Sequence, residues 1–340
     1  MVKVFVSHPP EQLDTYFGTA ATRALQEIAE VRFNGAPGEL STDALIAAAR
    51  GCDALIAYRQ TAAPEALFRE LPELLAFLRC AVDIRTVDVA AASAHGVLVT
   101  QASAGFVAAV AEWIVAAMID LGRGIVAYDR AARAGAPLVP FVGRELRGAT
   151  LGVIGLGRIG QRLAELALAF GMRVLATTPQ PFDDRGGTIG ALPLLELLGA
   201  SDFVVCLAPA NAETENLIDA AAFAAMRRGA FFINAARGEL VDDRALLAAL
   251  DSGHLAGCAL DVGRAPDQMP APELARHPRV LATPHIGGLT QPAIEHQAME
   301  TVRQLAALLA GELPPGAVNA EHATRWRRWH TARVGAKAAR

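Results

Sequence analysis

The sequence predicts an α/β protein with two domains, each built on a doubly wound parallel β-sheet. Short apolar runs alternate with helical segments along most of the 340 residues, which is the pattern of parallel strands joined by helices. The chain is longer than one average domain, and its composition, 53% hydrophobic and 19% charged, is that of a well-packed globular protein. A segment with neither pattern, Gln101–Gly105, places a domain boundary near residue 103.

The first domain is predicted from apolar runs that have the length of strands. These runs are Val2–Val6, Ala54–Tyr58, Leu75–Cys80 and Val97–Thr100. Helical patterns between them cover Glu11–Ala29 and Ser41–Arg50. Because such alternation is typical of a small α/β domain, we assign residues 1–103 to it.

A glycine cluster opens the core of the second domain. Gly155, Gly157 and Gly160 lie between an apolar run and a helical pattern, with Arg158 and Ile159 among them. The first glycine permits a tight strand-to-helix turn, the second lets the backbone approach a pyrophosphate, and the third lets helix and strand pack closely. Since a helix and a second apolar strand follow, the cluster indicates a dinucleotide-binding turn rather than an ordinary glycine turn.

Further apolar runs extend this second sheet. After a helix over 158–170, they lie at Arg173–Thr178, Phe203–Leu207, Phe231–Asn234, Ala259–Val262 and Val280–Ala282. We therefore expect a dinucleotide-binding domain over residues 104–290. A helix from Gln291 to Ala310 then returns the chain to the first domain, which comprises residues 1–103 plus 291–340. Two chain crossings imply a hinge.

Charge and hydropathy disfavour several classes of partner. The formal net charge is −4, so we expect no attraction to nucleic acid or to an anionic membrane, and a small-molecule role is favoured. The most apolar helix, over 106–121, is interrupted by Glu112 and Asp120 before it reaches the length of a membrane span. The first residues are strand-like and show no signal peptide, so we expect a cytoplasmic protein.

The cysteines predict neither a metal site nor a disulfide framework. The four cysteines are widely separated, lie in or beside apolar runs and form no Cys-x-x-Cys pair. We expect buried, reduced thiols at Cys52, Cys80, Cys206 and Cys258, and no metal ligands.

The end of the chain has a biased composition. Residues 325–340 hold six basic residues and no acids, together with Trp326 and Trp329. We favour a solvated tail or an extra helix whose tryptophans dock locally. A nucleic-acid patch is the alternative, but it would be isolated on an acidic chain.

Two polar side chains follow predicted strands, at the edge where open α/β sheets bind ligands. Arg237 has a fork of donors that matches a carboxylate and could polarise a carbonyl oxygen; a surface salt bridge is the alternative. His285 lies between a proline and two glycines, so its imidazole is held outward and could exchange a proton near neutral pH. A structural histidine is the alternative. Either Asp261 or Asp267 could stand behind it and raise its pKa.

Several motifs identify a resemblance. The motifs are Glu145–Gly148, Asn234–Leu250, Ser252–Gly257, Leu260–Val262 and Thr283–Gly288. In this order they resemble the D-isomer-specific 2-hydroxyacid dehydrogenases, over about residues 75 to 319. The resemblance implies a flavodoxin-like substrate domain beside a Rossmann-like dinucleotide-binding domain, with the ligand in the cleft between them. It also implies a homodimer formed through the cofactor domains, for which the helix around Glu112 and Trp113 is a plausible contact.

The resemblance also implies roles for particular residues. Arg237 would bind the substrate carboxylate and keto oxygen, His285 would be the acid/base, and Asp261 would contact the nicotinamide carboxamide. The family has a glutamate that pairs with the histidine, but five residues after Asp261 this chain has Pro266. One inserted residue aligns Asp267 instead, so we assign that supporting role to Asp267.

Two more departures concern the cofactor and the substrate. Thr178 replaces the acidic residue that normally binds the adenosine ribose, so NADP is permitted beside NAD. The first-domain substrate loop, usually glycine-rich, places Val82 and Asp83 at the substrate. The Asp83 side chain would repel a second carboxylate on the substrate, whereas Arg85 would attract one if it turned inward.

From these observations we expect an NAD(P)-dependent oxidoreductase that interconverts a small 2-oxo acid and its D-2-hydroxy acid. A dinucleotide-sensing binding protein on the same scaffold is one alternative. A dehydrogenase for a non-hydroxyacid such as formate or phosphite is the other.

Overall fold

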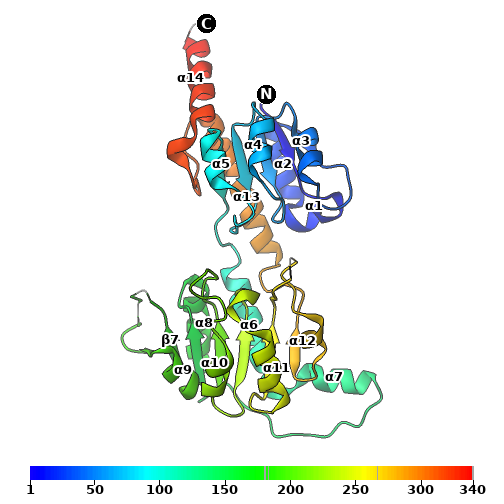
Figure 1. Ribbon diagram of the computed structural model, residues 1–340, viewed down its shortest axis with the longest axis vertical. Coiled ribbons are helices and arrows are strands. Elements are labelled where there is room, and N and C mark those ends of the chain that lie inside the picture. Colours follow the sequence, from blue (N-terminus) through cyan, green and yellow to red (C-terminus); the bar gives the residue numbers. More distant parts are fainter. Residues whose placement is uncertain (180, 183, 266, 339–340) are drawn as a thin grey trace. The chain divides into compact units, whose positions relative to one another are not determined.

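The computed structural model describes residues 1–179, 181–182, 184–265 and 267–338. The chain divides into two compact units, one of residues 1–105 with 291–340 and one of residues 106–290. Each unit holds one sheet whose strands are all parallel, with helices packed against it (Figure 1). The predicted fold class, two doubly wound parallel α/β units, is confirmed.

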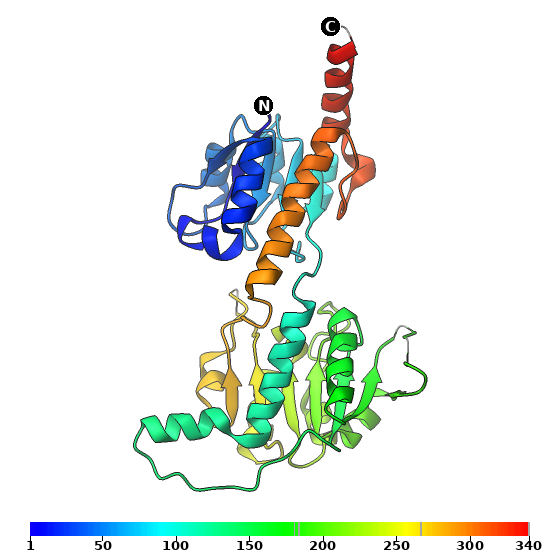
Figure 2. The ribbon, with the colours of Figure 1, turned by 180° about the vertical axis from the view of Figure 1, so that it is seen from behind.

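The first unit has a five-stranded sheet in the order β2-β1-β3-β4-β5, the flavodoxin-like order. Its strands are β1 Lys3–Val6, β2 Glu30–Phe33, β3 Ala54–Ala57, β4 Ala76–Arg79 and β5 Leu98–Gln101. Its helices are α1 Pro10–Tyr16, α2 Gly18–Ile28, α3 Thr42–Ala49, α4 Glu65–Glu70, α5 Val89–Ala94, α13 Gln291–Ala310 and α14 Thr324–Ala338. The returning helix α13 packs beside α2 and completes the core of this unit (Figure 2).

Two local features of the first unit differ from the sequence prediction. The predicted helix 11–29 is broken into α1 and α2, because Gly18 takes φ +83°, a left-handed conformation that helices do not continue through. Phe17, just before the break, is fully buried. The strand β2 was not predicted, since its alternating exposed and half-buried residues contain only two apolar side chains, Val31 and Phe33.

The second unit has a seven-stranded sheet in the order β12-β11-β10-β9-β6-β7-β8. Its strands are β6 Thr150–Ile154, β7 Arg173–Thr177, β8 Ile189–Ala191, β9 Phe203–Cys206, β10 Phe231–Asn234, β11 Gly257–Leu260 and β12 Val280–Ala282. Its helices are α6 Val107–Arg123, α7 Ile125–Arg133, α8 Arg158–Ala169, α9 Leu194–Ala200, α10 Ala220–Ala225, α11 Asp243–Asp251 and α12 Pro272–Arg276. Apolar side chains cover both faces, as parallel sheets require. The three-residue edge strand β8 was not predicted.

The basic C-terminal segment forms helix α14, and its first turns dock on the first unit. Trp326 is buried, and its Nε1 donates a hydrogen bond to the Leu308 carbonyl oxygen at 3.1 Å. The Arg325 guanidinium donates to the carbonyl oxygens of Phe68, Leu71 and Leu74. An extra helix with a docked tryptophan is therefore confirmed. Residues 339 and 340 lie outside the described residues.

Two further expectations concern cysteines and membranes. The four cysteines are buried and unpaired, as predicted. In the described part of the chain, no helix has both the length and the apolar character that crossing a membrane would need.

Candidate active site

The glycine turn follows β6 and begins α8, and its geometry fits a dinucleotide. Gly155 takes φ +95°, and a Cβ on it would lie 2.7 Å from the Ala208 nitrogen. A Cβ on Gly160 would lie 2.6 Å from the Gly155 oxygen, so helix and strand touch there. Around a Cβ on Gly157, no described atom lies within 4 Å. The backbone is therefore closely packed on the inside and open at the point where a pyrophosphate would approach.

The amino end of α8 supplies the electrostatic part of the same fit. Gly157 caps the helix without a side-chain hydrogen bond, so the N–H groups of the first turn are left for an anion. Arg158 is exposed in that turn, and Ile159 packs against the core beneath it. The five predicted cofactor residues of the glycine turn, from Gly155 to Gly160, thus lie in one continuous element, whereas Thr178 and Asp261 follow other strands.

Thr178 directly follows β7, in the position where an acidic residue would bind an adenosine ribose. It is half-buried, and no carboxylate occupies residues 177 to 179. Farther along this loop, Arg185 pairs with Glu165 on α8, which also receives a 2.7 Å hydrogen bond from Arg162. These two arginines lower the pKa of the Glu165 carboxyl below its ordinary value.

Arg237 follows β10 on a loop that a buried asparagine shapes. The side chain of Asn234, 1% exposed, donates to the Arg237 carbonyl oxygen at 2.9 Å and accepts from the Ala236 nitrogen at 3.0 Å. The Arg237 backbone is extended, and its guanidinium donates to the Ala236 oxygen at 2.7 Å. The side chain is half-buried at the sheet edge, a suitable place for anion recognition.

His285 follows β12 on a turn that Asp261 holds. His285 takes φ +54°, an uncommon conformation for a non-glycine residue. The buried Asp261 carboxylate, which follows β11, accepts hydrogen bonds from Thr283 Oγ1 at 2.6 Å and from the Ile286 and Gly287 nitrogens at 2.8 Å. Three donors thus fix the backbone on both sides of the imidazole. Sequence reasoning brought these two residues to one site but missed this direct link.

Asp267, to which the supporting role was assigned, lies on an exposed loop. Its Oδ1 accepts a hydrogen bond from the nitrogen of Met269, so the carboxylate shapes its own loop. The described contacts of Asp267 do not include His285. Pro266, the residue that the ungapped count selects, lies outside the described residues.

The predicted substrate loop of the first unit follows β4. Val82 and Asp83 are half-buried there. The Asp83 carboxylate pairs with the Arg85 guanidinium at 2.9 Å and accepts from the Arg85 nitrogen at 3.0 Å. A local counter-charge therefore offsets the repulsion that an isolated Asp83 would exert on an anionic substrate.

A buried arginine beneath this loop escaped the sequence analysis. Arg79, the last residue of β4, is 1% exposed and donates to the carbonyl oxygens of Tyr58, Thr61 and Asp83, and to Thr86 Oγ1. Burial lowers the pKa of its guanidinium to about 10, so it stays charged at neutral pH. A charged residue ending an otherwise apolar strand was the signal that could have revealed it.

Within the second unit, the predicted residues meet at one edge of the sheet. Because all its strands are parallel, the residues that follow β6, β10, β11 and β12 lie at the same edge. Strands β10, β11 and β12 are direct neighbours, so Arg237, Asp261 and His285 come from adjacent positions.

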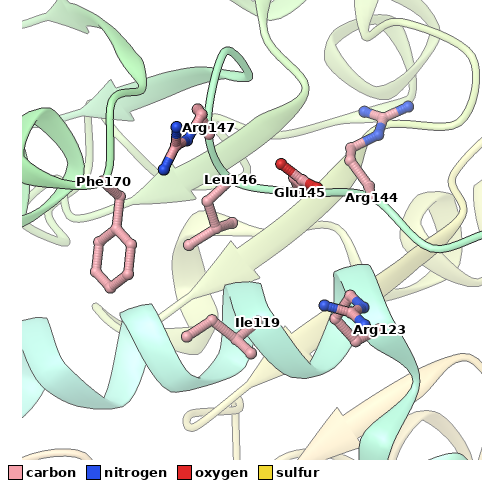
Figure 3. A pocket seen from close by; sticks show the side chains of 7 residues that line it. All are labelled: Ile119, Arg123, Arg144, Glu145, Leu146, Arg147 and Phe170. Carbon is pink, nitrogen blue, oxygen red and sulfur yellow. The ribbon is translucent and has the colours of Figure 1, made fainter.

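A cavity elsewhere in this unit contains none of these residues. Its volume is about 310 Å³, and it is lined by Ile119, Arg123, Arg144, Glu145, Leu146, Arg147 and Phe170 (Figure 3). These residues come from α6, from the residue that follows α8 and from the segment before β6, so the cavity lies near the edge of the sheet where the strands begin. Arg144 is paired there with Asp202 at 3.0 Å. The cavity is therefore distinct from the candidate active site.

Comparison with known families and proteins gives a consistent result. Residues 115–287, about half of the chain, match the family described as D-isomer specific 2-hydroxyacid dehydrogenase, NAD binding domain. The D-3-phosphoglycerate dehydrogenase of Mycobacterium tuberculosis is 36% identical over 301 residues, which cover 87% of this chain and 56% of that protein. The chain thus spans about half the length of the phosphoglycerate dehydrogenases that it matches.

Relatives of similar length are also found. The glyoxylate reductase of Pyrococcus horikoshii is 33% identical over 309 residues, which cover 88% of this chain and 92% of that protein. The solved structure of the D-lactate dehydrogenase of Escherichia coli superposes with a TM-score of 0.81 at 27% identity, covering 94% of this chain and all of that one.

Proposed function

Since the chain belongs to the D-isomer-specific 2-hydroxyacid dehydrogenase family, with an NAD-binding domain over residues 115–287, we propose that it interconverts a small 2-oxo acid and its D-2-hydroxy acid. The observation that carries this proposal is the shared sheet edge. Adjacent strands present an arginine, a buried carboxylate and a histidine on the same edge as a glycine turn that fits a dinucleotide.

The residues take complementary roles in this reaction. The Arg237 guanidinium binds the substrate carboxylate and orients the keto group. His285 gives a proton to the keto oxygen during reduction and takes it back from the hydroxyl during oxidation. NAD(P)H held by the glycine turn would supply the hydride for reduction of the keto carbon, so that each reduction would consume one NAD(P)H and one proton.

Asp261 and Asp267 serve the histidine in different ways. Asp261 fixes the turn through the Thr283 hydroxyl and two backbone nitrogens, so the imidazole is aimed by its backbone. The predicted contact of Asp261 with the nicotinamide carboxamide stays a proposal. Pairing of Asp267 with the imidazole also stays a proposal, and it requires the Asp267 carboxylate to leave its hydrogen bond to the Met269 nitrogen.

The substrate is proposed to be small, in line with the similarity to a glyoxylate reductase over nearly its whole length. In the first unit, the backbone around Val82 and Asp83 contacts it. We propose that NAD and NADP both bind, because Thr178 presents no carboxylate to a 2′-phosphate. Arg185 is a local source of positive charge for that phosphate if it leaves Glu165.

The proposal is tested by steady-state oxidation of NADH and NADPH in parallel with glyoxylate, hydroxypyruvate, pyruvate and phenylpyruvate. Turnover with at least one of these acids is expected, and the ratio between the two cofactors measures the effect of Thr178. Absence of turnover with all of them, while NADH still binds, would count against the proposal. That result would favour a dinucleotide sensor, or a dehydrogenase for formate or phosphite.

We also propose that the chain forms a homodimer through its second unit. Helix α7 has no buried residue, and with the segment that returns to β6 it extends away from the sheet (Figures 1 and 2). Large apolar side chains are exposed on this arm, among them Val139 at 73%, Phe141 at 55% and Val142 at 100%. Tyr128 stacks on Phe141 and so gives the arm a defined shape. Exposed apolar surface of this kind is typical of a protein interface.

The helix α6 around Glu112 and Trp113 is a second contact in this proposal.

The dimer is tested by sedimentation equilibrium of the wild type and of Val142→Asp. The wild type is expected to sediment as a dimer of about twice 35.6 kDa, and the variant as a monomer. As a control, Leu313→Asp changes another exposed apolar residue, in the first unit, and leaves the mass unchanged. A monomeric wild type would contradict the proposal.

The cytoplasm is the proposed location. The support comes from the cysteines, because four buried and unpaired thiols are typical of proteins from reducing compartments. Fractionation of the native host followed by immunodetection tests the location, and recovery in an oxidising compartment would contradict it.

A further inference from the structure

The loop that carries Arg237 is anchored on its upstream side by Asn234. As described above, the buried amide of Asn234 bonds the backbone of Ala236 and of Arg237 itself. Downstream, the chain forms a single helical turn over Gly238–Leu240 and then enters α11. Within that turn, Leu240 N lies 3.4 Å from Arg237 O, and Val241 N donates to Gly238 O at 3.1 Å. A bridge to Ile218, with Ile218 N donating to Leu240 O at 2.9 Å and Asp242 N to Ile218 O at 3.1 Å, ties the turn to the loop after β9. A link to the loop after β11 needs a further anchor.

Arg264 supplies that anchor. This residue lies in the loop after β11, and its guanidinium reaches across to the turn that follows Arg237. Its Nε and Nη2 donate to the Val241 oxygen at 3.0 and 2.8 Å, and Nη2 donates to the Glu239 oxygen at 2.9 Å. The two carbonyl groups are those of the second and fourth residues after Arg237.

The other half of the guanidinium is held by a third loop, between β9 and α10. Arg264 Nη1 pairs with Glu215 Oε1 at 2.7 Å, and Nη2 also bonds the side-chain oxygen of Asn216. Asn216 has a left-handed backbone with φ +52°, and its own nitrogen donates to the Glu239 oxygen at 2.9 Å. One side chain therefore joins three loops at a point two residues from Arg237.

Backbone packing leaves little space for the turn to shift while these bonds are intact. A Cβ on Gly238 would overlap the backbone of Gly263 and Arg264, so the two loops are in direct contact. Because Gly238 is the neighbour of Arg237, a movement of the loop after β11 is transmitted to the arginine. The contact between the two loops requires glycine at residue 238, and the hydrogen bonds of the Arg264 guanidinium keep the two loops together.

We propose that Arg264 is a positioning residue for Arg237, which fixes the substrate-binding guanidinium by clamping the turn over 238–241 to the loops after β9 and β11. The proposal rests on the proposed function, in which Arg237 binds the 2-oxo acid. Arg264 is 33% exposed and bonded to the protein on both sides of its fork, so it does not itself provide the anion site.

The planar fork is what this position requires. Five hydrogen bonds leave the guanidinium in fixed directions, toward two carbonyl groups on one side and a carboxylate and an amide on the other. A lysine has the same charge but a single nitrogen, which cannot reach both sides at once. Arg264→Lys is therefore expected to behave like Arg264→Ala, although its charge is retained.

The kinetic test compares Arg264→Ala and Arg264→Lys with Arg228→Ala, an exposed arginine of the same unit without a hydrogen bond in the described structure. A misplaced Arg237 is expected to raise the KM of the 2-oxo acid and the Kd of oxamate, an unreactive amide analogue of pyruvate, by about 10-fold or more in both Arg264 variants. Small displacements of binding groups have effects of up to about 10²-fold. The Kd of NADH is expected to stay within about twofold, because the glycine turn is untouched.

A second measurement does not depend on activity. Amide hydrogen exchange in peptides that cover residues 237–242 is expected to accelerate at least about tenfold in both Arg264 variants and to stay unchanged in Arg228→Ala. Unchanged exchange and oxamate affinity in Arg264→Ala would overturn the proposal, and so would full rescue by lysine. If the wild type reduces no 2-oxo acid and binds no oxamate, the proposed function fails. Accelerated exchange would then retain the clamp, whereas its role in substrate binding would be rejected.

Discussion

The two units anchor their functional loops with buried charges of opposite sign. In the second unit, the Asp261 carboxylate gathers one hydroxyl and two backbone nitrogens around the turn of His285. In the first unit, the Arg79 guanidinium gathers three backbone carbonyl groups and a threonine hydroxyl around the loop of Val82 and Asp83. Both residues lie at the carboxyl end of a parallel strand and are almost fully buried.

The difference between the Asp261 carboxylate and the Arg79 guanidinium shows how the same parallel-sheet architecture can fix two kinds of loop. A carboxylate accepts hydrogen bonds from backbone N–H groups, so Asp261 fixes the turn that carries the His285 side chain. A guanidinium donates to carbonyl oxygens, so Arg79 fixes the loop of Val82 and Asp83 through the carbonyl groups around it. We infer that the second unit supplies a reactive side chain and the first supplies binding groups. The predictions below test this division.

The largest effect is expected for His285→Gln. Loss of the proton donor should lower kcat by roughly 10² to 10⁴-fold, while the affinity for NADH is retained. In the first unit, Asp83→Asn should change kcat by less than about threefold, since Asp83 is paired locally with Arg85. Steady-state kinetics on the best 2-oxo acid measures both. Equal losses of kcat in the two variants would contradict the inference that the reactive side chain comes from the second unit.

Asp261→Ala is expected to affect both stability and turnover. The change leaves the Thr283 hydroxyl and the Ile286 and Gly287 nitrogens without their acceptor, which should lower the free energy of unfolding by about 3 kcal/mol. Urea unfolding measures the loss, and kcat should fall with it because His285 is no longer aimed. Asp251→Ala, at the exposed end of α11, is the matched control. Retention of wild-type stability would contradict the anchoring role.

Arg79→Met should cost less than the loss of Asp261. Three carbonyl groups lose their donor, but the methionine also removes the desolvation of a buried cation, so we expect a loss of about 2 kcal/mol in the free energy of unfolding. The kinetic signature should be a raised KM for the 2-oxo acid, with kcat little changed, because the first unit supplies binding groups. A loss of kcat without a change in KM would instead indicate that the first unit takes part in the chemical step.

The smallest effect at neutral pH is expected for His8→Phe, in the first unit. His8 is 1% exposed between Phe17 and Tyr58, and neither ring nitrogen has hydrogen-bond geometry to a described atom. Burial lowers the pKa of its imidazole to about 3, and the nearby Tyr16 backbone opposes this only in part. At pH 7 the His8 imidazole is mainly uncharged in both the folded and the unfolded state. The substitution His8→Phe should therefore leave the free energy of unfolding unchanged or raise it by about 1 kcal/mol.

Comparing the wild type with His8→Phe at different pH values shows whether His8 lowers the free energy of unfolding as the pH falls. Between the unfolded pKa near 6.5 and the folded pKa near 3, only the unfolded state takes up the proton. The wild type should therefore lose about 1.4 kcal/mol per pH unit from this group as the pH falls below 6.5, and His8→Phe should lack that loss. Urea unfolding at pH 7 and pH 5 measures the difference. Parallel curves would show that His8 is not titrated in this way.

Local patterns carried most of the sequence prediction. Apolar runs and glycine spacing depend on neighbouring residues, so they located the strands, the turn at Gly155 and the positions of Arg237 and His285 after β10 and β12. Short or half-exposed strands such as β2 and β8 were missed, since their patterns are too brief to stand out. The break at Gly18 was also missed, because a single left-handed residue leaves the helical pattern around it intact.

By itself the sequence determined the fold class and the residues that end up at one sheet edge, because parallel strands bring their carboxyl ends together whatever the loops do. The tertiary structure alone decided how the loops are held. Asp261 bonds the His285 turn, Asp267 bonds its own loop, and Arg79 and Arg264 join segments that are distant in sequence. Such bonds depend on directions and distances between separate loops, and a linear pattern of residue types does not encode these.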